Sequence, residues 1–187
     1  QVIIPLSEVE IGKNYAVLIT TNAGLWRYKI GDTVRFTSIS PYRIKVSGRT
    51  KHHINVFGEE LIIENAEEAL KNVCKKTNAE IVDFTGAPIF MKGKEKGAHE
   101  WLIEFKKPPK DINLFNELFD NALKSLNSDY EAKRYNNLTL NKPTIHIART
   151  QLFYDWLKLH DKLGGQHKIP RLSNTRDYID ELLKLNK

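Results

Sequence analysis

The first fifty residues alternate short apolar runs with polar separators. β-Branched and aromatic residues gather in four runs, at 15–20, 25–30, 33–39 and 43–48, and Asn, Gly, Asp or Ser-Pro stands between them. Such runs are typical of strands, and such separators are typical of turns. Because four strands without a helix make a poor core, we interpret residues 1–50 as the β-rich C-terminal end of a large N-terminal domain.

From residue 62 onward the hydrophobic pattern takes a helical period. In residues 62–77 one helical face carries Ile62, Ile63, Ala66, Ala69, Leu70 and Val73, which predicts an amphipathic helix. Residues 111–127 predict a second helix, with Asp111 as its N-cap. Its predicted inner stripe is Leu114, Phe115, Leu118, Ala122 and Leu126.

Further elements complete this second region. Strands are predicted at 79–90, 99–107 and 143–149, and helices at 151–163 and 175–186. Mixed elements of this kind predict a compact α+β domain over residues 51–187. The fold class is therefore α+β, with a strand-rich first part and a small α+β C-terminal domain.

The composition agrees with a globular protein, with 41% hydrophobic and 28% charged residues in 187. No apolar run approaches the roughly 18 residues that a membrane helix needs, and no signal peptide opens the chain. We therefore expect a cytoplasmic protein without a membrane partner. The single cysteine, Cys74, excludes an internal disulfide and indicates a reducing compartment. Its helical context favours a buried structural thiol over a nucleophile.

The net charge of +6 is unevenly distributed. Residues 133–187 contain 11 Lys/Arg and 5 Asp/Glu, whereas residues 1–132 contain 18 of each. A positive surface in the last third would suit nucleic acid or small anions such as nucleotide phosphates. A basic nucleic-acid-binding module is therefore one hypothesis for the function.

The stretch LWRYKIGD, residues 25–32, contains the first candidate for chemistry. Gly31 and Asp32 stand between two predicted strands, and Gly-Asp is a common turn pair. The same carboxylate can accept two charge-assisted hydrogen bonds from a diol. Gly31 would let a ligand approach the backbone closely. From these residues alone, Asp32 is either a turn residue or a ligand-binding residue.

Three stretches together carry a family resemblance. They are GLWRYKIGDTVRF (24–36), SGRTKHHINVFGEEL (47–61) and FYDWLKLHDKLGGQHKIPRL (153–172). Their order and spacing resemble the C-terminal portion of the Gretchen Hagen auxin-responsive family of acyl-acid amido synthetases. These enzymes belong to the adenylate-forming superfamily with firefly luciferase and the acyl-CoA synthetases. The resemblance implies a mobile C-terminal lid domain that turns on a hinge near residues 49–51.

The resemblance implies a two-step ligase reaction. A carboxylic acid attacks the α-phosphate of ATP-Mg and gives an acyl-adenylate and pyrophosphate; an amine, usually of an amino acid, then takes the acyl group and releases AMP. The implied partners are ATP and AMP, the acid, the acceptor and the N-terminal domain of the same protein, which would hold most of the Mg²⁺ site. Without that domain the chain alone is expected to be inactive. The stretch INVFGEEL resembles the acyl-CoA synthetases more closely and leaves an amine or a thiol as acceptor.

The resemblance also assigns nucleotide-binding residues in the first region. Asp32 matches the aspartate that binds the ribose hydroxyls, with Gly31 beside it. Tyr28 matches the signature tyrosine, which either contacts the ligand or packs in the core. Arg49 matches an arginine that supports the ribose and phosphate near the hinge, a role that the planar guanidinium suits. A solvated arginine at a strand end is the alternative for Arg49.

In the second region the resemblance implies one catalytic residue. Lys168 matches a lysine that reaches the α-phosphate and the substrate carboxylate during adenylation. A cation there would stabilise the negative charge that develops in the transition state. Arg171 is either a second phosphate contact or part of a salt bridge.

Other classes of site find little support in the sequence. His52 and His53 would point to opposite faces of a strand, and the remaining histidines lack ligand spacing, so we expect no metal site. A glycine-rich phosphate loop is missing from the chain, as expected if it lies upstream. A catalytically silent remnant that serves as an interaction domain is a further hypothesis. The presence of Asp32, Arg49 and Lys168 argues against it.

Overall fold

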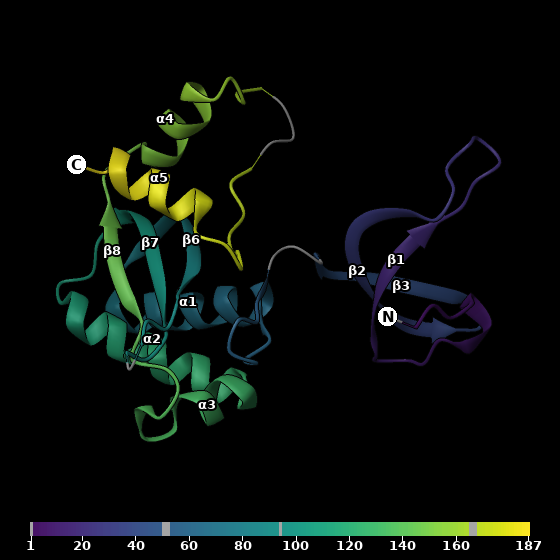
Figure 1. Cartoon of the computed structure of the whole chain (residues 1–187), viewed down its shortest axis with the longest axis horizontal. Helices are drawn as coiled ribbons and strands as arrows, with labels where there is room; N and C mark the ends of the chain where they lie inside the picture. The colour runs from purple at the N-terminus through teal and green to yellow at the C-terminus, as the bar shows by residue number, and fades with distance from the viewer. Residues whose placement is uncertain (1, 50–52, 94, 165–167) are drawn as a thin grey trace. The chain divides into compact units, whose positions relative to one another are not determined.

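The structure, a computed structural model, describes residues 2–49, 53–93, 95–164 and 168–187. The chain divides into two compact units, residues 1–51 and residues 52–187. Each unit contains a three-stranded sheet, and the α-helices of the described residues all lie in the second unit (Figure 1). The predicted α+β fold class is confirmed.

The first unit is a three-stranded antiparallel sheet in the order β1-β2-β3. After a short 3₁₀ turn, η1 (Leu6–Glu8), come β1 (Asn14–Ile19), β2 (Tyr28–Ile39) and β3 (Tyr42–Arg49). Val34 and Phe36 of β2 are buried. The ring of Phe36 packs edge-on against Tyr15 and Tyr42, with centroids 5.9 and 6.1 Å away.

The second and third strands predicted from the sequence are one strand. β2 continues through Gly31 and Asp32, so the predicted turn at this pair is wrong. The pairing register with β1 shifts between Ala16 and Leu18, opposite this point. Gly31 has a φ of +89°, a value that L side chains rarely adopt and glycine adopts freely. The glycine therefore serves a bulge inside a long strand, where three residues of β2 face one residue of β1.

The second unit has a central sheet in the order β6-β7-β8. β6 (Glu80–Ile89) is antiparallel to β7 (Ala98–Lys107), and β8 (Thr144–Ala148) is parallel to β7. One face of the sheet is covered by α1 (Ile63–Thr77), α2 (Ile112–Leu126) and α3 (Ser128–Arg134), and the other by α4 (Leu152–Leu159) and α5 (Asp177–Leu185) (Figure 1). A small ribbon of β4 (His53–Ile54) and β5 (Leu61–Ile62) precedes α1, and a 3₁₀ turn, η2 (Tyr135–Asn137), follows α3.

The central strand β7 is buried on both faces, as expected for the middle of three layers. Trp101 and Ile103 face the α1/α2 layer, and Leu102 faces the α4/α5 layer. The Trp101 ring packs edge-on against Phe119 of α2, with centroids 4.9 Å apart. On β6 the residue opposite Trp101 is Gly86. A Cβ atom there would lie 2.9 Å from the indole ring, so the sheet needs glycine at this position.

Helix α2 confirms its predicted cap and part of its predicted inner stripe: Phe115 is buried, and Leu118 and Ala122 pack against the core. The Asp111 carboxylate accepts hydrogen bonds from the backbone N–H groups of Asn113 and Leu114. The buried positions are Phe115, Phe119, Asp120 and Leu123, whereas Leu114 and Leu126 of the predicted stripe are 48% and 37% exposed. The larger phenyl rings at i and i+4 take the face toward Trp101 and Phe105, which turns the two leucines outward.

Helix α4 is shorter than the predicted 151–163. It ends at Leu159, and Asp161 adopts the left-handed conformation with φ +51°. The N–H of Asp161 donates to the carbonyl of Lys158, and that of Lys162 donates to the carbonyl of Leu157. This is the Schellman pattern. Glycine is the usual residue at the left-handed position, so an aspartate there gives little warning in the sequence.

Candidate functional site

The segment from Ile169 to Ser173, which we call the strap, is hydrogen-bonded along the edge of β6. The Thr85 hydroxyl donates to the carbonyl of Pro170 at 2.7 Å. The N–H of Gly86 donates to the carbonyl of Arg171 at 2.8 Å, and the N–H of Ser173 donates to the carbonyl of Gly86 at 3.0 Å. The strap is therefore an added parallel strand segment on the sheet of the second unit.

Two apolar side chains anchor the strap to both layers of the core. Ile169 is buried in the cluster under α4 and α5, and Leu172 is buried in the cluster under α1 and α2. Lys168 comes directly before Ile169 and is exposed. The backbone beside the predicted catalytic lysine is thus fixed, while its ammonium group can reach a ligand from solvent.

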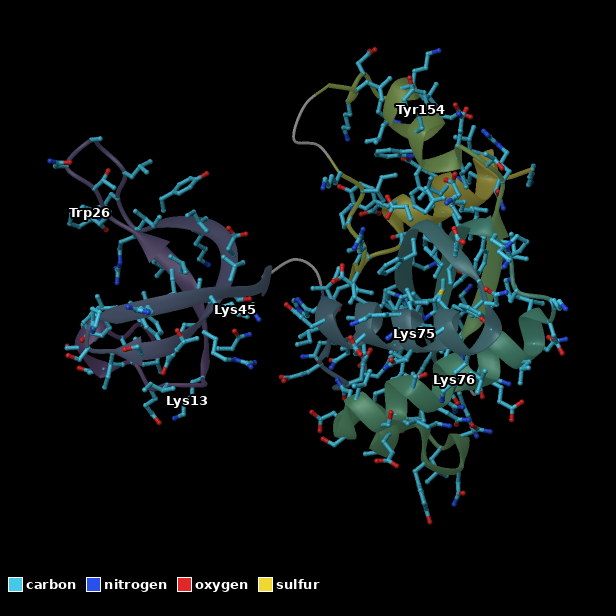
Figure 2. The ribbon with its side chains drawn as sticks, turned by 180° about the vertical axis from the view of Figure 1, so that it is seen from behind. Lys13, Trp26, Lys45, Lys75, Lys76 and Tyr154 are labelled. Carbon is cyan, nitrogen blue, oxygen red and sulfur yellow. The ribbon has the colours of Figure 1, made fainter. Side chains whose placement is uncertain are left out.

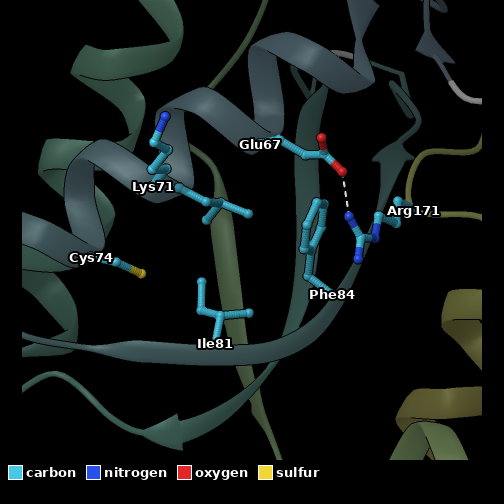
Figure 3. Close-up of a pocket in the computed structure, with 7 residues that line it drawn as sticks. Glu67, Lys71, Cys74, Ile81, Phe84 and Arg171 are labelled. Atoms are coloured by element: carbon cyan, nitrogen blue, oxygen red, sulfur yellow. Dashed lines mark hydrogen bonds and ion pairs between the residues drawn. The ribbon is translucent and has the colours of Figure 1, made fainter. Parts of the chain in front are cut away.

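Arg171 reaches from the strap to α1 (Figure 3). Its guanidinium forms an ion pair with the Glu67 carboxylate, lies 3.5 Å from Asp83 Oδ1 and stacks over the Phe84 ring at 5.1 Å. Of the two alternatives predicted for Arg171, the structure contains the salt bridge.

Arg171 also borders an open pocket of about 350 Å³. Its lining includes the apolar side chains Leu70, Ile81 and Phe84, the thiol of Cys74 and the charged groups of Glu67 and Lys71 (Figure 3). Burial raises the pKa of the Cys74 thiol, which disfavours the nucleophilic thiolate. Cys74 is half-buried on α1, whereas the sequence predicted a buried thiol.

In the first unit the structure brings Asp32 and Arg49 together as direct partners across β2 and β3. Asp32 is half-buried at the bulge, next to Gly31. The side chain of Arg49 lies outside the described part of the structure. Tyr28 is about half exposed at the start of β2, so it is not a core residue. Trp26 projects from the loop before β2 (Figure 2).

The predicted site residues thus form two groups, one in each unit. Gly31, Asp32 and Arg49 adjoin in the first unit, and Lys168 and Arg171 adjoin in the second. Three predicted features fall on residues outside the described ranges. They are the hinge at Thr50 and Lys51, residue His52, and the segment from Gly165 to His167.

Sequence reasoning missed a buried pair near the start of the second unit. His99 Nε2 and Glu59 Oε1 are 2.9 Å apart, and both side chains are fully buried. Burial alone would raise the pKa of Glu59, but hydrogen bonds from His99 and from backbone N–H groups at Phe57 and at Glu59 itself outweigh it and lower the pKa. An isolated histidine between Ala98 and Glu100 gave no signal for this pair.

A second buried network joins α2 to α3. The Asp120 carboxylate accepts hydrogen bonds from Arg134 and from the Tyr130 hydroxyl, each at 2.8 Å, and Lys124 Nζ lies 2.6 Å from it. Burial would raise the pKa of Asp120, but these three donors lower it. Burial, reinforced by the Asp120 charge, raises the pKa of Tyr130.

A third network joins β7 to β8 and α5. Glu100 accepts from Arg176 Nη2 at 2.5 Å and pairs with His146 Nε2 at 2.7 Å. Burial would lower the pKa of Arg176, but hydrogen bonds to Glu100 and Asp180 raise it. All three networks connect elements of the second unit, and no ligand is needed to explain them. Among the described residues, no group of three His, Cys, Asp or Glu side chains could hold a metal ion.

Comparison with protein families gives two adjoining matches. The model of the GH3 family C-terminal domain matches residues 64–177, which is more than half of the chain, and that of the GH3 family central domain matches residues 1–49. The chain belongs to the GH3 family. The resemblance predicted from the three sequence stretches is confirmed.

Two curated relatives illustrate the GH3 similarity. The chain is 23% identical over 182 residues to indole-3-acetic acid-amido synthetase GH3.3 of Arabidopsis thaliana. It is 29% identical over 177 residues to jasmonoyl–L-amino acid synthetase GH3.5 of Oryza sativa subsp. japonica. Both alignments cover 90% of this chain and 30% of the relative. The chain therefore spans about a third of the length of these GH3 ligases.

Solved structures agree with the GH3 fold. A structure of the GH3.15 acyl acid amido synthetase matches 98% of this chain with a TM-score of 0.76 at 21% identity. Another, in complex with 2,4-DB, matches 99% of it with a TM-score of 0.73 at 20% identity. The chain covers 36% and 34% of those two chains. Within the described residues, no helix has both the length and the apolar character to cross a membrane.

Proposed function

We propose that this chain is the C-terminal part of an ATP-dependent acyl-acid amido synthetase. The observation that carries the proposal is the succession of GH3 central and C-terminal domain matches in one chain. The proposed reaction joins a carboxylic acid to the amine of an amino acid through an acyl-adenylate. The proposed partners are ATP, AMP, the acid and the amino acid. The N-terminal domain of the complete protein is a further proposed partner.

In this proposal Asp32 binds the ribose of ATP. A half-buried carboxylate at a strand bulge can accept hydrogen bonds from both hydroxyls of the sugar. Arg49, its partner across the sheet, supports the ribose and a phosphate oxygen. ATP would bind with Mg²⁺, and most of the Mg²⁺ site would lie in the N-terminal domain of the complete protein.

Lys168 supplies the charge for adenylation. When a carboxylate attacks the α-phosphate, negative charge collects on the phosphate oxygens, and a positioned ammonium group stabilises it. The side chain of Lys168 is exposed, and the backbone next to it is anchored by the buried Ile169. The ammonium group can therefore extend to a ligand while its Cα atom stays in place. In the second step the lysine has no role, because in this proposal the C-terminal domain turns once the adenylate exists and the lysine leaves the site.

The charge distribution favours the ligase over a nucleic-acid-binding module. Each of the four arginines in residues 133–187 is engaged in an ion pair inside the chain: Arg134, Arg149, Arg171 and Arg176. Much of the basic excess in this third is therefore neutralised locally. Salt-dependent binding to random-sequence DNA, without binding of ATP or AMP, would contradict the proposal.

Lys168→Ala in the complete protein tests the proposed mechanism. We expect ATP–pyrophosphate exchange to fall about 100- to 1,000-fold, because a preorganised charge is lost from the transition state. Conversion of a chemically supplied acyl-adenylate to the amide should keep its normal rate. Lys158→Ala, which removes another exposed lysine from α4, is the matched control and should leave both rates unchanged.

Two outcomes would count against the proposal. If Lys168→Ala slows both half-reactions equally, or neither, Lys168 does not serve adenylation. The unaltered chain of 187 residues is a further control and should not exchange pyrophosphate by itself. Exchange at the rate of the complete protein would show that the ATP and acid sites lie within these residues.

A further inference from the structure

Thr85 stands where the strap meets the sheet. It is a β6 residue with only 1% of its surface exposed, and its hydroxyl donates to the carbonyl of Pro170. Pro170 is two residues after Lys168 and has no N–H of its own to offer the sheet. The Thr85 hydroxyl is therefore the first hydrogen bond from β6 to the strap after the lysine.

Of the side chains that hold the strap by polar contacts, Thr85 is buried and Arg171 is partly exposed. Arg171 and Glu67 form an ion pair in which the two side chains are 41% and 47% exposed, and exposed pairs contribute little. The Thr85 hydroxyl is shielded from water, so a replacement without a hydroxyl leaves the Pro170 carbonyl without this partner.

The β6 backbone next to this bond is hydrogen-bonded to the strap and closely packed. Gly86 follows Thr85 and is bonded on both sides to the strap, through Arg171 and Ser173. It also lies against the Trp101 ring so closely that a Cβ atom would clash. This part of β6 is therefore packed closely against the core, and the Thr85 hydroxyl holds the Pro170 carbonyl against it.

We propose that Thr85 is a positioning residue for Lys168. Its hydroxyl fixes the start of the strap and thereby the origin of the lysine side chain, so that the ammonium group meets the reacting phosphate with little further ordering. This inference rests on the proposed role of Lys168 in adenylation. Thr85 itself touches no substrate in this account.

The test is Thr85→Val in the complete protein, because valine keeps the shape of threonine and removes the hydroxyl. Hydrogen exchange of the Gly86 and Ser173 amides reports whether the strap detaches, and we expect it to become about three- to tenfold faster. The kcat of ATP–pyrophosphate exchange should fall by a similar factor, with KM for ATP unchanged, because only the transition-state geometry is affected.

Controls separate this role from general destabilisation. Thr77→Val removes a hydroxyl that donates to the Val73 carbonyl at 2.8 Å inside α1, and it should change neither strap exchange nor kcat. Thr85→Ser should keep kcat near the normal value, whereas Thr85→Ala should lower it. This last pair differs only in the hydroxyl and decides the question if the valine variant does not fold.

The inference is overturned if strap exchange accelerates while kcat stays normal, or if kcat falls while strap exchange is unchanged. It is also overturned if Thr85→Val changes neither quantity. Failure of the proposed function has a different signature, in which Lys168→Ala leaves pyrophosphate exchange intact. In that case hydrogen exchange of the strap amides in Thr85→Val still shows whether the hydroxyl anchors the strap. If their hydrogen exchange is unchanged, the proposed role of Thr85 is wrong as well.

Discussion

The two units of the chain differ in how much hydrophobic core each one contains. Among the described residues of the first unit, only Val34 and Phe36 are buried hydrophobic residues, and Tyr42, Ile44 and Val46 on β3 are about half exposed or more. The sheet of the second unit is covered by helices on both faces and encloses two apolar clusters. Burial of apolar surface is the main source of folding free energy. The second unit therefore gains far more stabilisation from its core than the first unit does.

This difference indicates that the two groups of site residues are supported in different ways. Lys168 depends on contacts made entirely inside the second unit, through Ile169 and Leu172. Asp32 depends on strand pairing in a sheet with little core of its own. We therefore expect core mutations in the second unit to unfold it, and core mutations in the first unit to have a local effect.

The largest expected effect is that of Phe119→Ala. Its ring is fully buried against Trp101, and a buried phenylalanine truncated to alanine costs about 3–5 kcal/mol. Phe36→Ala is the matched variant in the first unit and should leave the main thermal transition of the chain unchanged. Calorimetry or far-UV circular dichroism on the 187-residue chain measures both. Equal losses for the two variants would mean that the units unfold together and that the comparison fails.

The contrast between the units also explains how much of the fold the sequence predicted. In the second unit the positions of α1, β6, β7, α2 and β8 follow the apolar pattern closely. Helices α1 and α2 each bury one regular face, and β7 is buried on both faces. Helix α3 was not predicted. It is short, and it is held by the side chain of Asn127, which caps it by accepting from the Tyr130 N–H at 2.7 Å, and by the ion pair of Asp120 with Arg134.

In the first unit the residue types at Gly31 and Asp32 predicted a turn that the structure does not contain. Gly31 and Asp32 have the composition of a turn, yet the sheet continues through them because a bulge can use the same glycine conformation. Local turn chemistry cannot distinguish these two outcomes. The register of Asp32 with Arg49 depends on strand pairing, which residue types alone do not specify.

The candidate site was predicted by resemblance and not by periodicity. No pattern of residues 168–173 indicates an added strand, because the bonds to Thr85 and Gly86 join segments 85 residues or more apart in sequence. The buried Glu59–His99 pair also joins segments that are far apart in sequence, 40 residues in this case. Contacts between distant segments are set by the packing of whole layers, which a local pattern does not contain.

A smaller effect is expected for Asp32→Ala in the complete protein. Loss of a charge-assisted hydrogen bond costs about 1.5–3 kcal/mol, or roughly ten- to a hundredfold in affinity, so KM for ATP in pyrophosphate exchange should rise by that factor. The thermal transition of the second unit should not move. Glu8→Ala removes an exposed carboxylate from the same unit and serves as the control. An unchanged ATP dependence with an intact fold would return Asp32 to a structural role in the bulge.

The smallest expected effect is a pH dependence confined to the second unit. The folded-state pKa of Asp120 is lowered: burial would raise it, but the donors Arg134, Lys124 and Tyr130 outweigh burial. Because its pKa is lowered on folding, the ionised Asp120 carboxylate stabilises the folded state at pH values above its unfolded-state pKa near 4. This stabilisation is lost as the pH falls through the folded-state pKa. Each such carboxyl adds at most about 1.4 kcal/mol per pH unit to the slope of the unfolding free energy against pH.

Denaturant unfolding between pH 6 and pH 2.5 measures this slope. The unfolding free energy of Asp120→Asn should change less with pH than that of the unaltered chain. Asp129→Asn, an exposed position on α3, should keep the original slope. If Asp120→Asn also keeps it, the Asp120 network does not contribute to the acid sensitivity of the second unit.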